Sequence, residues 1–147
     1  SACQDTGIDG IILPDLPFEE KDEFLPVCRR YGVDLISSIA PTSGNRTAII
    51  SREAEGFLYI VSSLGVTGAG GGDKTDPASM IRAVRESSDI PCAVSFDGSS
   101  PEEAAAMAAA ADGVIADSAI VRLIERYGRE AAEHIGEYVR AVKQALR

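Results

Sequence analysis

A chain of 147 residues with 45% hydrophobic and 25% charged residues is ordinary for a soluble globular protein and long enough for one domain with a sizeable core. The net charge of −9 argues against a nucleic-acid-binding surface and against binding to anionic membranes. No apolar run approaches the ~20 residues that span a bilayer. The N-terminal residues lack the basic start and the apolar segment of a signal peptide, so we expect a cytoplasmic protein. Because the first residue is not Met, we also expect the chain to begin inside a longer one.

One pattern recurs five times along the chain. A short run of aliphatic and β-branched residues is followed by a turn and then by an amphipathic segment, with starts near the ~30-residue spacing of a βαβ unit. Little alternation occurs within these runs, which is typical of strands buried on both faces of a parallel sheet. The predicted strands are Ile8–Leu13, Val33–Ile39, Gly56–Ser62, Pro91–Phe96 and Gly113–Ala116.

The segments between the strands carry helix signals. The stretch 18–31 begins with acidic and ends with basic residues before Gly32, but Pro26 inside it implies a kink or a late start. Asp76 and Ser100 are expected to cap helices over 77–87 and 100–111, each with proline at the first helical position. A short helix is expected over 118–125, followed by a long terminal helix over 129–147.

These elements predict a single domain over 1–147 of the α/β class. Five βα units at ~30 residues each account for the length, and eight such units make a complete (β/α)₈ barrel. An open doubly wound sheet is the structural alternative, and the periodicity alone does not separate the two. We favour a partial barrel of parallel strands.

In both architectures, function resides in loops after the carboxyl ends of the strands. Asp15 follows the first strand between Pro14 and Pro17, which hold it at a fixed angle; a helix-entry acid is the plainer interpretation. The glycine-rich stretch 62–76 is long enough to be an active-site lid, although a flexible linker would look similar. Small residues follow the last two strands and lead into helices, an arrangement that often binds phosphate in barrels.

The sequence offers little for metal or nucleophilic chemistry. The three scattered cysteines and the single histidine, His134, do not supply the closely spaced ligands of a zinc site, so we expect reduced thiols and no metal. His134 lies within the predicted terminal helix, where a surface or groove-filling role is expected. No Walker-type phosphate loop is present.

Taken in order, several segments resemble the alpha subunit of tryptophan synthase, and FLYIVSSLGVTGA at 57–69 is the most specific. The others are GIDGIILPDLPFEE at 7–20, IAPTS at 39–43, SSPEE at 99–103 and DGVIADSAIV at 112–121. The likeness covers the whole chain but only the latter portion of the family, about five of eight βα units. It implies a TIM barrel, strands four to eight, and a lyase of tryptophan biosynthesis that cleaves indole-3-glycerol phosphate to indole and glyceraldehyde 3-phosphate by a retro-aldol step. It implies no cofactor, and a beta-subunit partner in an alpha2beta2 heterotetramer.

The resemblance also implies roles for particular residues. Thr67 matches a lid residue that assists a catalytic aspartate, and Asp15 and Pro17 match a loop near the partner interface. The remaining positions match substrate-binding ones: four line the indole pocket and the others surround the phosphate. They are Ile39, Tyr59, Val61 and Phe96, followed by Gly68, Asp97, Gly98, Asp117 and Ser118. For the apolar positions, plain core packing is the alternative.

Two departures from the family pattern bear on activity. The acid–base glutamate and the aspartate that meets the indole N–H come from earlier loops, upstream of Ser1, so we expect no turnover from this chain alone. Asp97 and Asp117 also fall where the phosphate site should offer backbone N–H groups. A carboxylate ~5 Å from a phosphate charge costs about 3 kcal/mol at an effective dielectric of ~20, so we expect weakened phosphate binding.

Two other functions remain open. A non-catalytic module that docks a beta-type subunit is favoured by the missing carboxylates and by the two aspartates. Another phosphate-binding TIM-barrel enzyme, such as an epimerase, would be expected to need metal-binding histidines, and the chain has only one.

Overall fold

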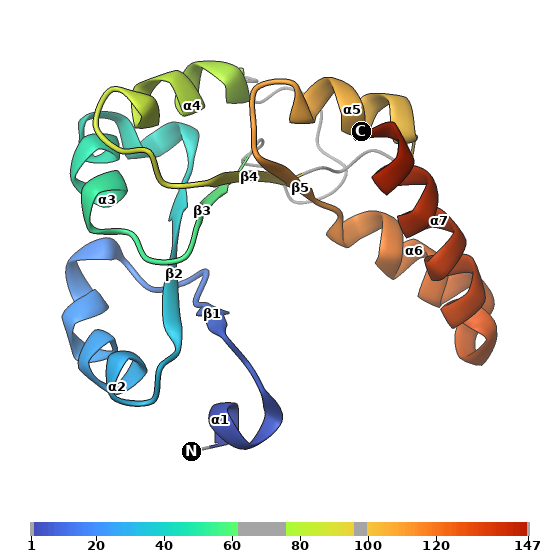
Figure 1. Cartoon of the computed structure of the whole chain (residues 1–147), viewed down its shortest axis with the longest axis horizontal. Helices are drawn as coiled ribbons and strands as arrows, with labels where there is room; N and C mark the ends of the chain where they lie inside the picture. The colour runs from blue at the N-terminus through green and yellow to red at the C-terminus, as the bar shows by residue number, and fades with distance from the viewer. Residues whose placement is uncertain (1, 62–75, 96–99, 147) are drawn as a thin grey trace. The chain divides into compact units, whose positions relative to one another are not determined.

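The computed structural model describes residues 2–61, 76–95 and 100–146. They pack as two compact units, residues 1–92 and 93–147. A single domain over the whole chain stays a prediction. Figure 1 shows the elements of both units, and no helix within the described ranges is long and apolar enough to cross a membrane.

The elements of the first unit follow the predicted order of strands and helices. They are α1 (Ala2–Thr6), β1 (Gly10–Ile12), the 3₁₀ helix η1 (Phe18–Glu23), α2 (Leu25–Arg30), β2 (Asp34–Ile39), the 3₁₀ helix η2 (Pro41–Arg46), α3 (Thr47–Glu53), β3 (Leu58–Ile60) and α4 (Pro77–Arg85). Strand β4 (Cys92–Ser95) begins at the last residue of the first unit. The second unit continues with α5 (Pro101–Ala108), β5 (Gly113–Ile115), α6 (Asp117–Tyr127), the 3₁₀ helix η3 (Gly128–Glu130) and α7 (Ala131–Ala145).

The strands of the first unit are parallel and pair in chain order. Asp34 on β2 faces Gly10 on β1, and Ser38 on β2 faces Tyr59 on β3. The amide of Leu58 donates to the Pro91 carbonyl at 2.8 Å, which joins the segment before β4 to the same ladder. Helices α2, α3 and α4 lie on one side of these strands (Figure 1).

Local sequence explains where the helices begin. Asp76 caps α4 by accepting from the Ala78 amide at 3.0 Å, and Pro77 occupies its first position, as predicted. The predicted helix over 18–31 is instead split into η1 and α2, because Pro26 has no N–H to continue an α-helix through the Phe24 junction. Three exposed ion pairs connect this η1–α2 layer to the next helical layer: Lys21 with Glu53, Arg29 with Glu55, and Arg46 with Glu19.

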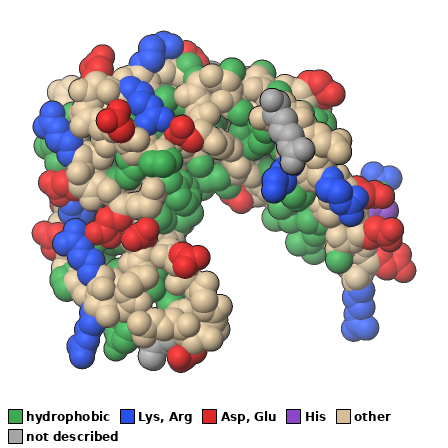
Figure 2. Space-filling model, viewed as in Figure 1, with side chains coloured by type: hydrophobic (Ala, Val, Ile, Leu, Met, Phe, Trp, Pro, Cys, Tyr) green, Lys and Arg blue, Asp and Glu red, His purple; other side chains and the backbone are tan. Residues whose placement is uncertain are grey.

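The core of the first unit lies between the strands and the helices. Ile39, Leu58, Ile60 and Val84 are fully buried there, with Met80 and Ile81 of α4 nearly so. Charged side chains gather over the helices of this unit, whereas hydrophobic side chains show along its strands (Figure 2). Burial of this one strand face against helices is the main source of its stability.

In the second unit β4 and β5 are parallel, with Ala93 facing Gly113. Ser100 caps α5 by accepting from the Glu103 amide at 3.2 Å, as predicted from the sequence. A small apolar cluster joins α5, β5 and α7; its buried members are Ala104 and Val142, and Met107, Val114, Ala116 and Tyr138 pack against them. Gly128 ends α6 with a φ of 52°, and Tyr127 stacks on His134 across this break with ring centroids 3.6 Å apart.

Candidate functional site

The register of β2 and β3 decides which side chains share a face of the sheet. Residues that face each other in a parallel ladder project to the same side, and successive residues alternate. Ser38 faces Tyr59 and Ile39 faces Ile60, while the Val61 amide extends the ladder by donating to the Ile39 carbonyl at 2.8 Å. Ser38, Tyr59 and Val61 therefore lie on one face, and Ile39 lies with Ile60 on the other.

Burial distinguishes the two faces. Ile39, Leu58 and Ile60 have no exposed surface, because helices α3 and α4 cover their side of the strands. Tyr59 and Val61 are only half-buried, and Ser38 is exposed. We call the side that carries Ser38, Tyr59 and Val61 the open face. The structure thus brings the predicted pocket residues Tyr59 and Val61 together, but it does not bring Ile39 to them.

Two glycines shape the start of the open face around Ile36. A Cβ on Gly10 would lie 3.3 Å from the Ile36 side chain, and one on Gly56 would lie 2.9 Å from Ile36 Cδ1 and 2.8 Å from an Asp34 carboxylate oxygen. Gly56 also has a φ of 65°, which favours glycine. The absence of both side chains lets Ile36 bury all but 8% of its surface on this face.

The loop after β2 is held by a reciprocal pair of hydrogen bonds. The Ser43 amide donates to the Ala40 carbonyl at 2.8 Å, and the Ala40 amide donates to Ser43 Oγ at 3.1 Å. Ser43 is buried, and Pro41 between these residues starts η2. The motif IAPTS therefore builds a fixed turn at the carboxyl end of β2, next to the open face.

Asp15 and Pro17 lie beyond the carboxyl end of β1. The Leu16 amide donates to the Leu13 carbonyl at 3.1 Å, which closes a turn around Asp15, and Pro17 directly precedes η1. Both residues are exposed, as a loop that meets a partner requires. Their predicted position at the interface stays a prediction.

In the second unit Asp117 and Ser118 form the first turn of α6, directly after β5. Asp117 is exposed and Ser118 half-buried, and both take part in polar interactions. An acid in the first turn of a helix interacts favourably with the helix dipole, so Asp117 competes with an external anion for the same positive end. The predicted short helix over 118–125 is confirmed as α6, with one more residue at its start and two more at its end.

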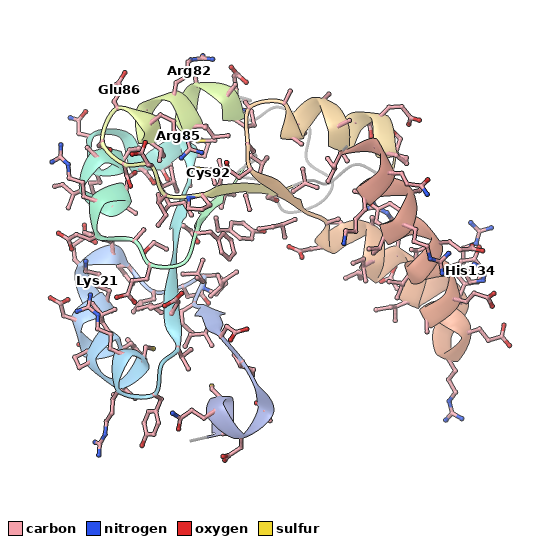
Figure 3. The ribbon with its side chains drawn as sticks, in the orientation of Figure 1. Lys21, Arg82, Arg85, Glu86, Cys92 and His134 are labelled. Atoms are coloured by element: carbon pink, nitrogen blue, oxygen red, sulfur yellow. The ribbon has the colours of Figure 1, made fainter. Side chains whose placement is uncertain are left out.

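The remaining predicted site residues, Thr67, Gly68, Phe96, Asp97 and Gly98, lie outside the described residues. His134 lies on α7 (Figure 3), where its imidazole stacks on Tyr127 and lies 3.8 Å from a Glu137 carboxylate oxygen. Within the described ranges, no group of three metal-ligating side chains comes together. All three cysteines are free thiols; burial raises the pKa of the Cys28 thiol, and the Glu55 carboxylate adds to this.

Comparison with known proteins gives a consistent result. The family model of the tryptophan synthase alpha chain matches residues 1–147. Tryptophan synthase alpha chains from Lacticaseibacillus casei and Lactiplantibacillus plantarum are 37% and 42% identical, and each match covers 98% of this chain and 54% of the relative. The chain thus spans about half the length of the curated relatives that it matches.

Solved structures agree with the sequence matches. A protein from Aquifex aeolicus superposes with a TM-score of 0.80 at 33% identity, covering 99% of this chain and 53% of the other. The structure of the tryptophan synthase a2b2 complex from Pyrococcus furiosus contains a chain that matches with a TM-score of 0.78 at 27% identity, covering 97% of this chain and 56% of that one. These matches confirm the fold class expected from the sequence, a partial TIM barrel with parallel strands.

Proposed function

Because the chain belongs to the tryptophan synthase alpha chain family, we propose that it provides the latter five βα units of a lyase that cleaves indole-3-glycerol phosphate to indole and glyceraldehyde 3-phosphate. The observation that carries the proposal is the family match over residues 1–147. It is supported by the half-exposed Tyr59 and Val61, which lie side by side with Ser38 at the carboxyl end of β2 and β3.

The open face suits the aromatic part of this substrate. Tyr59 offers a ring edge or face and Val61 an apolar surface, and a planar indole would bury both. Ile39, which lies on the helix-covered face, contributes to this site only by packing beneath it. Phe96 and Gly68 are proposed to complete the binding site, and Thr67 to assist catalysis from the lid.

We assign the phosphate to the loops after β4 and β5. Ser118 in the first turn of α6 would offer its hydroxyl and amide, with Gly98 contributing from the preceding loop. Asp97 and Asp117 weaken this binding by charge repulsion, by about a hundredfold per phosphate charge for a carboxylate ~5 Å away. No metal and no cofactor takes part in the proposed reaction.

Cleavage needs a base for the substrate hydroxyl and an acid for the indole ring. In our proposal the carboxylates that do this work are supplied by the three earlier βα units of the barrel, so this chain alone has no turnover. We further propose that the complete protein acts in the cytoplasm and binds a beta subunit through the loop that contains Asp15 and Pro17, in an alpha2beta2 assembly. The exposed turn around Asp15 supports that placement.

The proposal is tested by fusing the first half of the Geobacter sulfurreducens relative, which is 42% identical to this chain, to residues 1–147. The fusion should release indole from indole-3-glycerol phosphate, whereas the 147-residue chain should not. The control is the same fusion with the upstream catalytic glutamate changed to glutamine. A fusion that folds cooperatively and yields no indole would overturn the lyase assignment.

The second candidate, a non-catalytic module that docks a beta-type subunit, is favoured by the acidic first turn of α6. Titration of glycerol 3-phosphate separates the two. In the lyase, the double variant Asp97→Gly/Asp117→Gly binds the phosphate tighter, by about two orders of magnitude for each carboxylate that lies ~5 Å from a single phosphate charge. Equal affinity of parent and double variant would remove the repulsion argument, and an inactive fusion that still binds a beta subunit would support the docking module.

A further inference from the structure

Lys21 connects the 3₁₀ helix η1 to the end of α3. Its ammonium pairs with the Glu53 carboxylate and lies 4.1 Å from the centre of the ring of Phe18, the first residue of η1. Lys21 is labelled on η1 in Figure 3. Only 14% of its side chain is exposed, so water competes weakly for the ammonium, and the two contacts fix η1 against α3.

The same 3₁₀ helix holds one end of the loop that contains Asp15. Pro17 is the N-cap of η1, and its carbonyl accepts from the Glu20 amide at 3.0 Å. The proline ring fixes the φ of Pro17 and restricts Leu16, so a displacement of η1 is transmitted to the turn that the Leu16 amide closes on the Leu13 carbonyl. The placement of η1 therefore decides where the loop lies.

A second ion pair of η1 is weaker. Arg46 Nη1 lies 2.9 Å from a Glu19 carboxylate oxygen, but both side chains are more than half exposed. Ion pairs this open to solvent contribute little to stability. Lys21 is thus the stronger of these two links between η1 and the next helical layer.

We propose that Lys21 is a positioning residue of the partner-docking loop, residues 13–17: by fixing η1 on α3, it presents this loop to a beta-type subunit in one arrangement. The inference rests on the proposed function, because it takes the loop to be part of the interface. A loop that is already ordered loses less conformational freedom when a partner binds, so this order raises the affinity. Because the contacts of Lys21 lie in the helical layer and not on the open face, it acts on association rather than on the cleavage step.

Three variants separate the two contacts. Lys21→Met keeps the length of the side chain but removes the ammonium and therefore both contacts, whereas Glu53→Gln removes the ion pair and keeps the ring contact. Each contact changes an equilibrium constant by about two- to fivefold, so Lys21→Met should have the larger effect. Lys21→Arg keeps a cation and should restore the parent behaviour. A side chain that only fills space would be replaced equally well by methionine.

Glu55 supplies a matched control. Its Oε1 accepts from Arg29 Nε at 2.7 Å, so Glu55→Gln breaks an ion pair between the same two layers by the same chemical change. Arg29 lies on α2 and not on η1. The Glu55 side chain is more buried than that of Glu53, 22% against 51% exposed, so a general loss of stability should be at least as large in the control. The difference between the two glutamine variants therefore reports on the loop.

The first measurement is hydrogen exchange of the Leu16 amide in the 147-residue chain, which reports how often the turn opens without any partner present. Exchange should be about fourfold faster or more in Lys21→Met and about two- to fivefold faster in Glu53→Gln. It should be unchanged in Lys21→Arg and in Glu55→Gln. The second measurement is the affinity of the fusion protein for the beta subunit of the organism that supplies its first half. This affinity should fall about twofold or more in Lys21→Met, less in Glu53→Gln, and not in Lys21→Arg or Glu55→Gln.

Several outcomes would overturn the inference. Leu16 exchange that is the same in the parent and in Lys21→Met would refute it and leave the lyase proposal intact. Equal effects of Lys21→Met and Lys21→Arg, equal effects of the two glutamine variants, or faster exchange with unchanged affinity for the beta subunit would refute it as well. If the parent fusion does not bind the beta subunit, the inference fails together with the proposed interface, and indole release by the fusion alone decides whether the lyase assignment survives.

Discussion

Replacing Tyr138 with phenylalanine should stabilise the second unit. The Tyr138 hydroxyl is buried in the cluster formed by α5, β5 and α7, and within the described part of the chain it has no hydrogen-bond partner. In the unfolded chain this hydroxyl forms hydrogen bonds with water. Folding therefore removes the water that hydrates this oxygen and provides no hydrogen-bond partner in its place. The ring itself packs against Ala104 and Val142.

The magnitude follows from the cost of an unsatisfied polar group. Burying a hydroxyl without a partner costs about 1–3 kcal/mol, and phenylalanine keeps the ring that fills the space. We expect Tyr138→Phe to raise the free energy of unfolding by about 1 kcal/mol, the low end, since the residue as a whole is only half-buried. For a chain of this length that corresponds to roughly 3 °C in Tm.

Alkaline titration gives an independent test of the same oxygen. Burial raises the pKa of Tyr138, although the nearby Arg122 charge acts in the opposite direction. A phenol whose folded pKa exceeds its unfolded value contributes stability that is present below the unfolded pKa, about 10, and is lost as the pH rises through the folded pKa. Tyr138→Phe lacks this loss, so its advantage should grow above pH ~10.

The assay is reversible urea unfolding followed by circular dichroism at neutral and at alkaline pH. Tyr31→Phe is the control, because Tyr31 lies in the first unit and its hydroxyl is not buried without a partner. It should change stability by less than about 0.5 kcal/mol. Destabilisation by Tyr138→Phe at neutral pH would show that the hydroxyl is satisfied after all and would refute the reasoning.

Two further predictions concern the first unit. Gly56→Ala should lower the free energy of unfolding by about 2 kcal/mol or more, because the new Cβ would lie less than 3.0 Å from Asp34 and Ile36 and the residue has a φ of 65°. Gly32→Ala is the control: Gly32 also has a positive φ but open space around it, so this variant should lose less stability. Equal losses of the two variants in denaturant titrations would contradict this prediction. Arg46 donates a hydrogen bond that holds the pKa of Glu19 below its ordinary value, so that pKa should rise in Arg46→Gln when followed by NMR. The stability lost in that variant should be seen at neutral pH and vanish as the pH falls through the lowered pKa, whereas an unshifted Glu19 would exclude the interaction.

The strands could be predicted from sequence because each is a compact run of aliphatic and β-branched residues. All five predicted runs contain an observed strand, although the strands are shorter than the runs at one or both ends. The helix caps Asp76 and Ser100 could also be predicted, because a residue with a side-chain oxygen directly before proline indicates the start of a helix. Helix α3 was not predicted. Arg46 precedes it without a capping side chain, and Pro41 and Gly44 in η2 look like an ordinary loop.

The candidate site was predictable in part. The motif around Tyr59 identified two residues of the open face, and their shared exposure agrees with that reading. Ile39 was assigned to the same pocket by resemblance, but the register puts it beside Ile60. Strand alternation could have pointed to Ser38 instead, if the pairing of β2 with β3 had been known. Pairing register is a long-range property, and a single sequence does not contain it directly.

The space that Gly10 and Gly56 leave for Ile36 affects the pairing register of β2. A register shift of one residue would move every side chain of the strand to the opposite face of the sheet. Ser37 and Ser38 would then exchange faces, so these two residues do not disfavour the shifted register. Ile36 opposes the shift, because it fits between two glycines and would be replaced there by Leu35 or Ser37. Ile39 opposes it as well, because the shift would move this fully buried side chain off the helix-covered face. Ile36 in its recess and the buried Ile39 on the opposite face together fix the alignment of the strand that carries the serine of the open face.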